Sequence, residues 1–293
     1  MKNLMIPALA LFLSAAAQAD DSPLWMRYCA ISPDGQTIAF SYQGDIYTVP
    51  SSGGKARQLT THPAHDTRPV WSPDGQRIAF ASNRSGNFDV FLMNKEGGEP
   101  KRLTTHSTNE YPTTFKDNGH ILYLANVLQD AKDIQFPGTR FMQVYEISTD
   151  GGRPDLYSSL YMENIALSKD GSKLLYNDYK GYEDPWRKHH QSSITRDIWL
   201  CTLGKDRSFQ KVTTFGGEDR NPVWAADGAS FYYLSEEKGS FNIFKKDLAG
   251  NSEKQITKHT TPCVSLPPII PGLYAIVTTA RSIPLRKARN LPR

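Results

Sequence analysis

Three arginines and one loop carry the side chains of this sequence that are best suited to binding another molecule. Arg68 and Arg220 each stand ahead of a Pro-Val-Trp segment, so we take them to match in position, and Arg27 is a third candidate nearer the N-terminus. The loop combines aromatic rings with positive charge, a composition typical of protein contact surfaces. Its candidate binding residues are Tyr182, Trp186, Arg187, His189 and His190. The alternative for this loop is that it packs on the sequence repeat that carries it.

The sequence shows no signature of catalysis or of metal binding. It has no Gly-x-Ser-x-Gly nucleophile motif, no His-Glu-x-x-His helix and no cysteine pair at zinc spacing. His62 and His65 are three residues apart, but His62 shares its sequence context with His106, so we interpret the pair as a repeat feature. We therefore predict a chain with no catalytic residue, no metal and no cofactor.

The net charge bears on the possible partners, and the cysteines bear on possible disulfides. The net charge of +4 is modest and dispersed, which gives no reason to expect binding to nucleic acid or to a membrane surface. Cys29, Cys201 and Cys263 are scattered and do not make a disulfide framework, so we expect buried free thiols. The oligomeric state stays open.

A repeated pattern of four strands must position these side chains. Residues 68–105 contain four short apolar runs separated by three turn signals, of which the first is Ser72-Pro73-Asp74-Gly75. The glycine of this turn recurs at intervals of 40, 44, 52 and 57 residues, as Gly35, Gly75, Gly119, Gly171 and Gly228. Four antiparallel strands in about forty residues are typical of one blade of a β-propeller.

We therefore predict an all-β fold, a β-propeller of four-stranded antiparallel blades within residues 20–258. Five blades are recognisable, at about 27–62, 66–106, 110–158, 163–214 and 218–258. Because the innermost strands of a propeller line its axial channel, Arg68 and Arg220, with Arg27 as a third candidate, would present positive charge there. Bracing of neighbouring blades is an equally good role for these arginines.

Recurring Asp and Trp residues have structural explanations in this fold. Turn aspartates such as Asp34 and Asp74 stand where a β-turn favours Asp, and those that open third strands, such as Asp45, should accept hydrogen bonds. Trp71 and Trp224 occupy the same place in their blades, so we expect them to pack between blades.

Two blades carry long insertions. These lie at 129–139 and 179–196, in each case between the second and third strands of the blade. Since both occupy the same strand junction, both should emerge on one rim, and insertions on one face often mark the binding face.

The two ends of the chain differ from the repeat. A basic start, an apolar run over 4–17 and small residues before Asp20 indicate a signal peptide cleaved after Ala19, hence a periplasmic or secreted product without a stable membrane anchor. Residues 259–293 show no Asp-Gly turn and no alternating strands where a sixth blade is due. We expect a frameshift near Thr260 that has scrambled this sixth blade.

The repeat resembles a known group of propellers. SPDGQTIAF, SPDGQRIAFASNRSGNFDVFLMN and KRLTTH are similar to the WD-like repeats of TolB-type propellers. LWMRYCAISPDGQTIAF and GYEDPWRKHHQSSITRDIWL resemble the N-terminal six-bladed propeller of exported tricorn-like serine peptidases. In that family a second propeller, a PDZ domain and the peptidase domain follow. This sequence stops at Arg293, so the resemblance implies a truncated form and assigns no catalytic residue.

These observations favour a non-catalytic, exported propeller that binds or gates peptides, as the N-terminal part of a tricorn-like peptidase. The alternative is a stand-alone TolB-like periplasmic module that binds another envelope protein through one rim. A propeller hydrolase or lactonase would need a metal or a nucleophile at the channel mouth, and the sequence shows neither.

Overall fold

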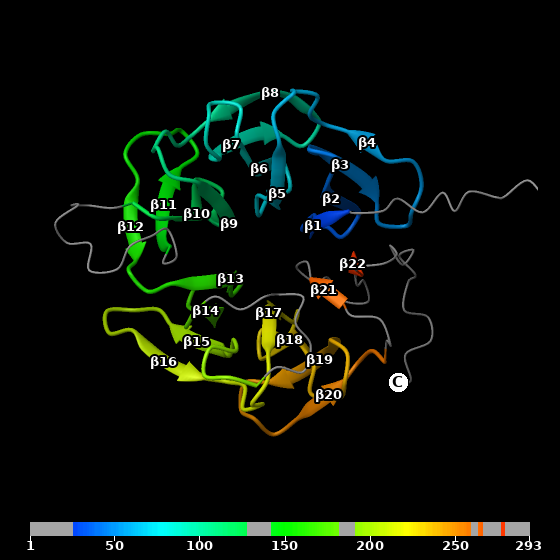
Figure 1. Cartoon of the computed structure of the whole chain (residues 1–293), viewed down its shortest axis with the longest axis vertical. Coiled ribbons are helices and arrows are strands. Elements are labelled where there is room, and N and C mark those ends of the chain that lie inside the picture. The colour runs from blue at the N-terminus through cyan, green and yellow to red at the C-terminus, as the bar shows by residue number, and fades with distance from the viewer. Residues whose placement is uncertain (1–25, 128–141, 182–190, 259–262, 266–276, 279–293) are drawn as a thin grey trace, which may run out of the picture.

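The computed structural model describes residues 26–127, 142–181, 191–258, 263–265 and 277–278. Within them, five four-stranded antiparallel sheets follow one another around a ring, and each sheet is one propeller blade (Figure 1). The all-β propeller predicted from the repeat is therefore confirmed. No helix in these described ranges is long and apolar enough to cross a membrane.

Each blade takes its four strands in chain order, from the innermost to the outermost. Blade 1 comprises β1 (Arg27–Ile31), β2 (Thr37–Tyr42), β3 (Asp45–Pro50) and β4 (Arg57–Gln58). Blade 2 comprises β5 (Asp66–Trp71), β6 (Arg77–Ser82), β7 (Asp89–Asn94) and β8 (Gly97–Arg102). Blade 3 comprises β9 (Glu110–Asp117), β10 (His120–Ala125), β11 (Gln143–Ser148) and β12 (Asp155–Ser158). Blade 4 comprises β13 (Met162–Leu167), β14 (Lys173–Asp178), β15 (Ile198–Thr202) and β16 (Ser208–Lys211). Blade 5 comprises β17 (Asp219–Trp224), β18 (Ser230–Ser235), β19 (Asn242–Asp247) and β20 (Glu253–Gln255).

Two short strands lie in the C-terminal tail. β21 (Cys263–Ser265) and β22 (Val277–Thr278) form a two-stranded antiparallel sheet, which Figure 1 shows between blades 1 and 5. The expectation of a tail without strands is therefore wrong at these residues, because their backbones pair despite the missing repeat pattern.

A hydrogen-bonded aspartate closes the turn between the first two strands of a blade. Ser32 Oγ donates to Asp34 Oδ1 at 2.5 Å, and the same carboxylate oxygen accepts the Gln36 N–H at 3.0 Å. Equivalent bonds recur at Asp74 and Asp170. The structural role predicted for the turn aspartates is confirmed at these positions.

The other recurring residues also take the predicted structural roles. Asp45 accepts a hydrogen bond from Thr60 Oγ1 at 3.0 Å, which ties the start of β3 to the segment after β4. Trp71 Nε1 donates to the carbonyl of Ala30 in blade 1 at 3.1 Å. In the same way, the indole of Trp224 bonds a carbonyl of blade 4 at 2.9 Å. Both tryptophans therefore join neighbouring blades, as expected.

Apolar side chains fill the spaces between neighbouring blades. Blades 2 and 3 enclose Val90, Leu92, Phe115, Ile121, Tyr123 and Ile147, and similar clusters separate the other adjacent pairs. Cys29 and Cys201 are free thiols, as predicted. Cys201 is buried between blades 3 and 4, but Cys29 is half-buried, so the expected burial is wrong for Cys29. Each blade is thus held by its neighbours rather than by one central core.

One end of every blade carries both the start of the innermost strand and the loop between the second and third strands. In blade 1, Arg27 at the start of β1 pairs with Ser41 near the end of β2, and Tyr42 pairs with Asp45 at the start of β3. We call this end of the blades the insertion rim, because the insertions at 129–139 and 179–196 join the same two strands in blades 3 and 4.

Candidate functional site

A β-bulge shapes the start of the innermost strand in blades 1, 2, 4 and 5. One residue in each bulge has a left-handed backbone: Tyr28 (φ 51°), Arg68 (φ 54°), Asn164 (φ 50°) and Asn221 (φ 55°). This conformation suits Asn and is uncommon for Tyr and Arg. Bulges often reorient a side chain near functional sites. Tyr28 in blade 1 and Arg68 in blade 2 are therefore candidates for a functional site.

The strand register corrects the predicted match between Arg68 and Arg220. Arg220 occupies the register position of Thr67, one residue before the left-handed residue of the bulge. Arg68 is therefore equivalent to Asn221, not to Arg220. Counting back from Pro-Val-Trp gives the same result, because Arg68 directly precedes that segment whereas Asn221 stands between Arg220 and it.

Arg68 lies between two aromatic rings from neighbouring blades. Its guanidinium carbon is 4.3 Å from the centre of the Tyr111 ring in blade 3 and 5.2 Å from that of Tyr28 in blade 1. Both distances fit cation–π contacts. Among the described residues, no carboxylate lies within ion-pair distance of Arg68. We call Tyr28, Arg68 and Tyr111 the Arg68 cluster.

The Arg68 cluster is partly open to solvent. Tyr28 is 42% exposed, one of few large hydrophobic side chains so exposed in the described part of the chain. Arg68 and Tyr111 are half-buried. Arg68 also acts electrostatically on Tyr161, in the loop that enters blade 4: burial raises the pKa of Tyr161, and the charge of Arg68 opposes that rise.

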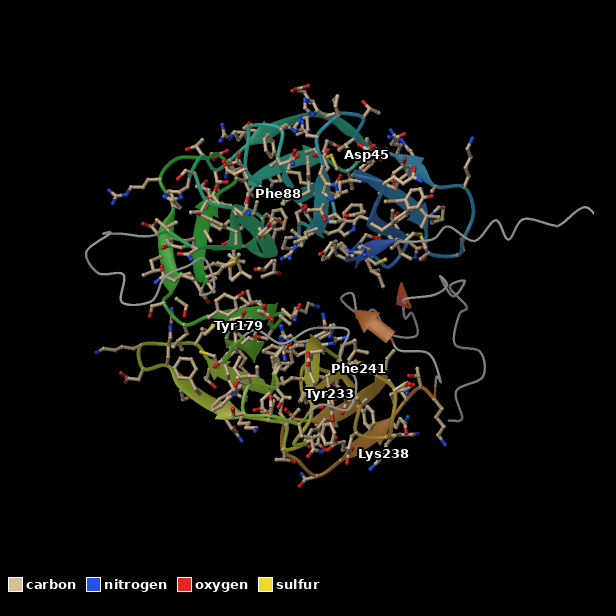
Figure 2. The ribbon with its side chains drawn as sticks, in the orientation of Figure 1. Asp45, Phe88, Tyr179, Tyr233, Lys238 and Phe241 are labelled. Atoms are coloured by element: carbon tan, nitrogen blue, oxygen red, sulfur yellow. The ribbon has the colours of Figure 1, made fainter. Side chains whose placement is uncertain are left out.

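Further rings extend the cluster along the insertion rim. The rings of Phe88 and Tyr111 lie 5.5 Å apart, and His65 stands edge-on to Phe88 at 6.0 Å. On blade 4, the rings of Tyr161 and Tyr179 lie 4.3 Å apart. Figure 2 shows Phe88 in the half of the ring formed by blades 1 to 3, and Tyr179 in the other half.

Blades 4 and 5 present a chain of alternating charges instead. Arg196 donates to Glu163 Oε2 at 2.8 Å and to Glu218 Oε1 at 3.1 Å, and Arg220 lies 3.5 Å from the same Glu218 oxygen. We call Glu163, Arg196, Glu218 and Arg220 the ionic chain. Burial alone would lower the pKa of Arg196, but the two glutamates raise it.

Arg220 is buried and makes contacts within the fold. It is 6% exposed, and its guanidinium carbon lies 4.1 Å from the centre of the Phe241 ring. Burial lowers its pKa, and Glu218 opposes that effect. These contacts tie blade 4 to blade 5, the bracing role that was the alternative for the arginines.

Of the remaining predicted site residues, the structure describes Arg27 alone. Arg27 is exposed at the start of β1. The predicted binding residues of the blade 4 loop, Tyr182, Trp186, Arg187, His189 and His190, lie outside the described residues, as does the insertion at 129–139. The described base of the blade 4 loop is anchored by Lys180, whose Nζ lies 2.6 Å from Asp197 Oδ2.

The histidines behave as a repeat feature, as predicted. His62 Nδ1 accepts the Ala64 N–H at 3.0 Å, and His106 Nδ1 accepts the Thr108 N–H at 3.2 Å. Each ring therefore folds the loop between two blades in the same manner. In the described ranges, no three His, Cys, Asp or Glu side chains are grouped so that they could hold a metal ion.

Sequence reasoning missed the aromatic partners of Arg68. Tyr28 follows the candidate Arg27, whereas Tyr111 has no candidate beside it. The signal that could have found both is their place at the start of an innermost strand. Their contact with Arg68 depends on how three blades are oriented around the ring, and a single repeat does not encode that orientation.

Comparison with known proteins agrees with this geometry. The model of the family described as "Tricorn protease N-terminal beta propeller domain" matches residues 23–269. A tricorn protease homolog of Saccharolobus solfataricus is 23% identical over 243 residues, which cover 80% of this chain and 21% of the homolog. The chain thus spans about a fifth of the length of that relative.

Solved structures show the same fold. The tricorn protease crystal structure aligns with a TM-score of 0.69 at 19% identity, over 87% of this chain and 24% of that chain. TolB from Acinetobacter baumannii aligns with a TM-score of 0.56 at 17% identity, over 78% of this chain and 53% of that chain. The resemblance noted in the repeat is thus confirmed, and the chain belongs to the tricorn protease N-terminal β-propeller family.

Proposed function

We propose that the chain is a non-catalytic binding or gating module that holds extended peptides at the insertion rim, with the Arg68 cluster as its main contact. The observation that carries this proposal is the position of Arg68 between Tyr28 and Tyr111, with no described carboxylate as an ion-pair partner. The half-buried Arg84 of the same blade, by contrast, pairs with Asp66 at 3.0 Å.

The chemistry of the cluster suits a peptide. The two tyrosine rings restrain the guanidinium, so little side-chain entropy is lost when it binds a ligand. The N–H groups on its edge can donate to peptide carbonyls or to a carboxylate, and such charged hydrogen bonds are the stronger kind. The exposed ring of Tyr28 offers apolar contact beside them.

The longer relatives suggest what such peptide binding would serve. The matched relative is named a tricorn protease homolog, and this chain corresponds to about a fifth of it. We infer that the propeller handles peptides for a catalytic part located elsewhere. The alternative, a stand-alone TolB-like module that binds a folded envelope protein, predicts a broad protein contact that does not depend on Arg68.

Export of the protein is part of the same proposal. It is supported by the signal-peptide pattern of residues 1–19, which lie outside the described residues. An exported propeller would meet unfolded peptides and envelope proteins rather than nucleic acid.

Binding of a fluorescein-labelled, unstructured peptide rich in Gly, Ser and Glu, followed by fluorescence anisotropy, tests the site. The variant Arg68→Asn is suited to this test because Asn occupies the equivalent left-handed position in blades 4 and 5. We expect its affinity to fall about tenfold or more, since a charged hydrogen bond contributes about 1.5–3 kcal/mol.

The matched control is Arg57→Asn. Arg57 is an exposed arginine on outer strand β4 that pairs with Glu96, so its loss changes the net charge equally. We expect this variant to bind like the wild type. Equal binding by the wild type and Arg68→Asn would remove the Arg68 cluster from the proposal.

A further inference from the structure

Two buried carboxyl groups meet between blades 2 and 3. Asp89 begins β7 and is 0% exposed, and Glu110 begins β9 and is 1% exposed. Glu110 Oε2 is buried without a hydrogen-bond partner in the described part of the chain, and the neighbouring Asp89 raises the pKa of Glu110. Two carboxylates buried beside each other repel, and a proton on one of them removes that repulsion. A pair that holds one proton is therefore the state that this burial favours.

The nearby charges cannot stabilise two carboxylates at once. Arg102 lies 2.9 Å from Asp89 and neutralises one negative charge. Burial, together with the neighbouring Asp89, raises the pKa of Glu110 to about 7, although hydrogen bonds from Thr104 and from the His106 backbone oppose the rise. The hydroxyl of Tyr123 is buried beside Glu110 and offers no positive charge.

Several other charged side chains on the surrounding elements pair with one another. Asp66 and Arg84 of blade 2 pair with each other, and Glu163 of blade 4 pairs with Arg196. The remaining groups are Arg68 on β5, His106 in the loop before β9, and Tyr145 on β11. Of these, only His106 is of a type that ordinarily ionises near neutral pH.

The carboxyl pair is one residue away from the aromatic rings of the insertion rim. The N–H of Glu110 donates to the carbonyl of Phe88 at 2.7 Å, which joins β9 to the residue before β7. The ring of Phe88 contacts Tyr111, and Tyr111 lies under Arg68. A change in the distance between Asp89 and Glu110 would therefore move their chain neighbours, Phe88 and Tyr111.

We propose that the Asp89–Glu110 pair is a pH-sensitive joint between blades 2 and 3, which keeps the Arg68 cluster assembled while it holds its proton and loosens when that proton is lost. The structural part of this inference stands on its own, whereas its effect on ligand binding rests on the proposed function. The periplasm or a secreted setting would expose such a joint directly to external pH.

Hydrogen–deuterium exchange, measured by mass spectrometry between pH 6 and pH 8, tests the joint without any ligand. After correction for intrinsic exchange, we expect the wild-type segment that begins β9 to lose protection about tenfold over this range, the linkage expected for a carboxyl with an unfolded pKa of 4.5 and a folded pKa of about 7.

Three variants make the test specific. Glu110→Gln keeps the shape of the side chain but has no group that titrates. The protection of the β9 segment in this variant should therefore change less than twofold with pH. His106→Asn and Asp219→Asn, which alter a nearby histidine and the blade 5 counterpart of Glu110, should keep the wild-type transition. A wild type without the transition, or a Glu110→Gln variant that retains it, overturns the proposal.

Peptide anisotropy at pH 6 and pH 8 tests the link to the Arg68 cluster. We expect wild-type affinity to fall as the pH rises and that of Glu110→Gln to stay level. An exchange transition with pH-independent binding overturns the link. Failure to bind the peptide at either pH refutes the proposed function instead, and the exchange data alone then decide whether the joint exists.

Discussion

Asp219 gives the sharpest prediction of stability. It begins β17, its side chain is 1% exposed, and its N–H donates to the carbonyl of Arg196 at 3.1 Å. Burial raises its pKa from 3.8 to about 7, against the effect of hydrogen bonds from Ser235 and Thr213. The folded protein therefore retains a proton that the unfolded chain releases at a lower pH.

The sign and size of the effect follow from this difference. Because the folded pKa is the higher one, the contribution of Asp219 to stability is fully present below pH 3.8 and is lost as the pH rises through about 7. Between pH 5 and pH 8 the loss amounts to about 2.5 kcal/mol in the free energy of unfolding. Asp219→Asn, which imitates the neutral carboxyl, should not lose this amount.

Urea unfolding at pH 5, 6, 7 and 8 measures the effect as a difference between variant and wild type. We expect similar stabilities at pH 5 and an Asn variant that is about 2.5 kcal/mol more stable at pH 8. Asp170→Asn is the control, since hydrogen bonds from Ser168 and Ser172 lower the pKa of that exposed turn carboxyl to about 2, outside the range tested. Parallel pH curves for Asp219→Asn and the wild type would refute the reasoning.

Three further predictions concern packing and the two ends of the chain. Trp224→Phe removes the hydrogen bond to Ala166 and should lower the free energy of unfolding by about 1 kcal/mol in urea titrations, more if the carbonyl stays buried without a partner. Intact mass of the purified protein should show a chain that begins at Asp20, and a mass that retains residues 1–19 would contradict the signal peptide. Sequencing of the gene should show that the codons after Thr260, read one nucleotide earlier, encode strands of a sixth blade, and a shifted frame without such strands would contradict the frameshift.

The sequence predicts most of the fold because the repeat is local. Asp34 and Asp74 form their turns with residues two positions away, so spacing alone identifies them. Trp71 is likewise recognisable, since its partner Ala30 is one repeat earlier. The order and number of recognisable blades follow from the same spacing.

The candidate site is less accessible to sequence reasoning because it depends on relations between blades. The match between Arg68 and Arg220 is an exception, because Arg68 directly precedes the Pro-Val-Trp segment whereas Asn221 stands between Arg220 and that segment. Asp66 and Glu110 occupy equivalent starts of innermost strands, yet Asp66 pairs with Arg84, whereas Glu110 is buried and its pKa is raised by a neighbouring carboxyl. Such differences arise from neighbours in three dimensions, which a repeat pattern does not distinguish.

Photo-cross-linking tests most directly whether the Arg68 cluster is where peptides bind. An unstructured peptide that carries one benzoyl-phenylalanine would be irradiated with the protein, and the adducts would be located by tryptic mass spectrometry. We predict adducts in the segments that contain Tyr28 and Tyr111, suppressed by excess unlabelled peptide and weakened in Arg68→Asn. Adducts confined to the outer strands β4, β8, β12, β16 and β20, or to the turns at the opposite end of the blades, would contradict the proposed site.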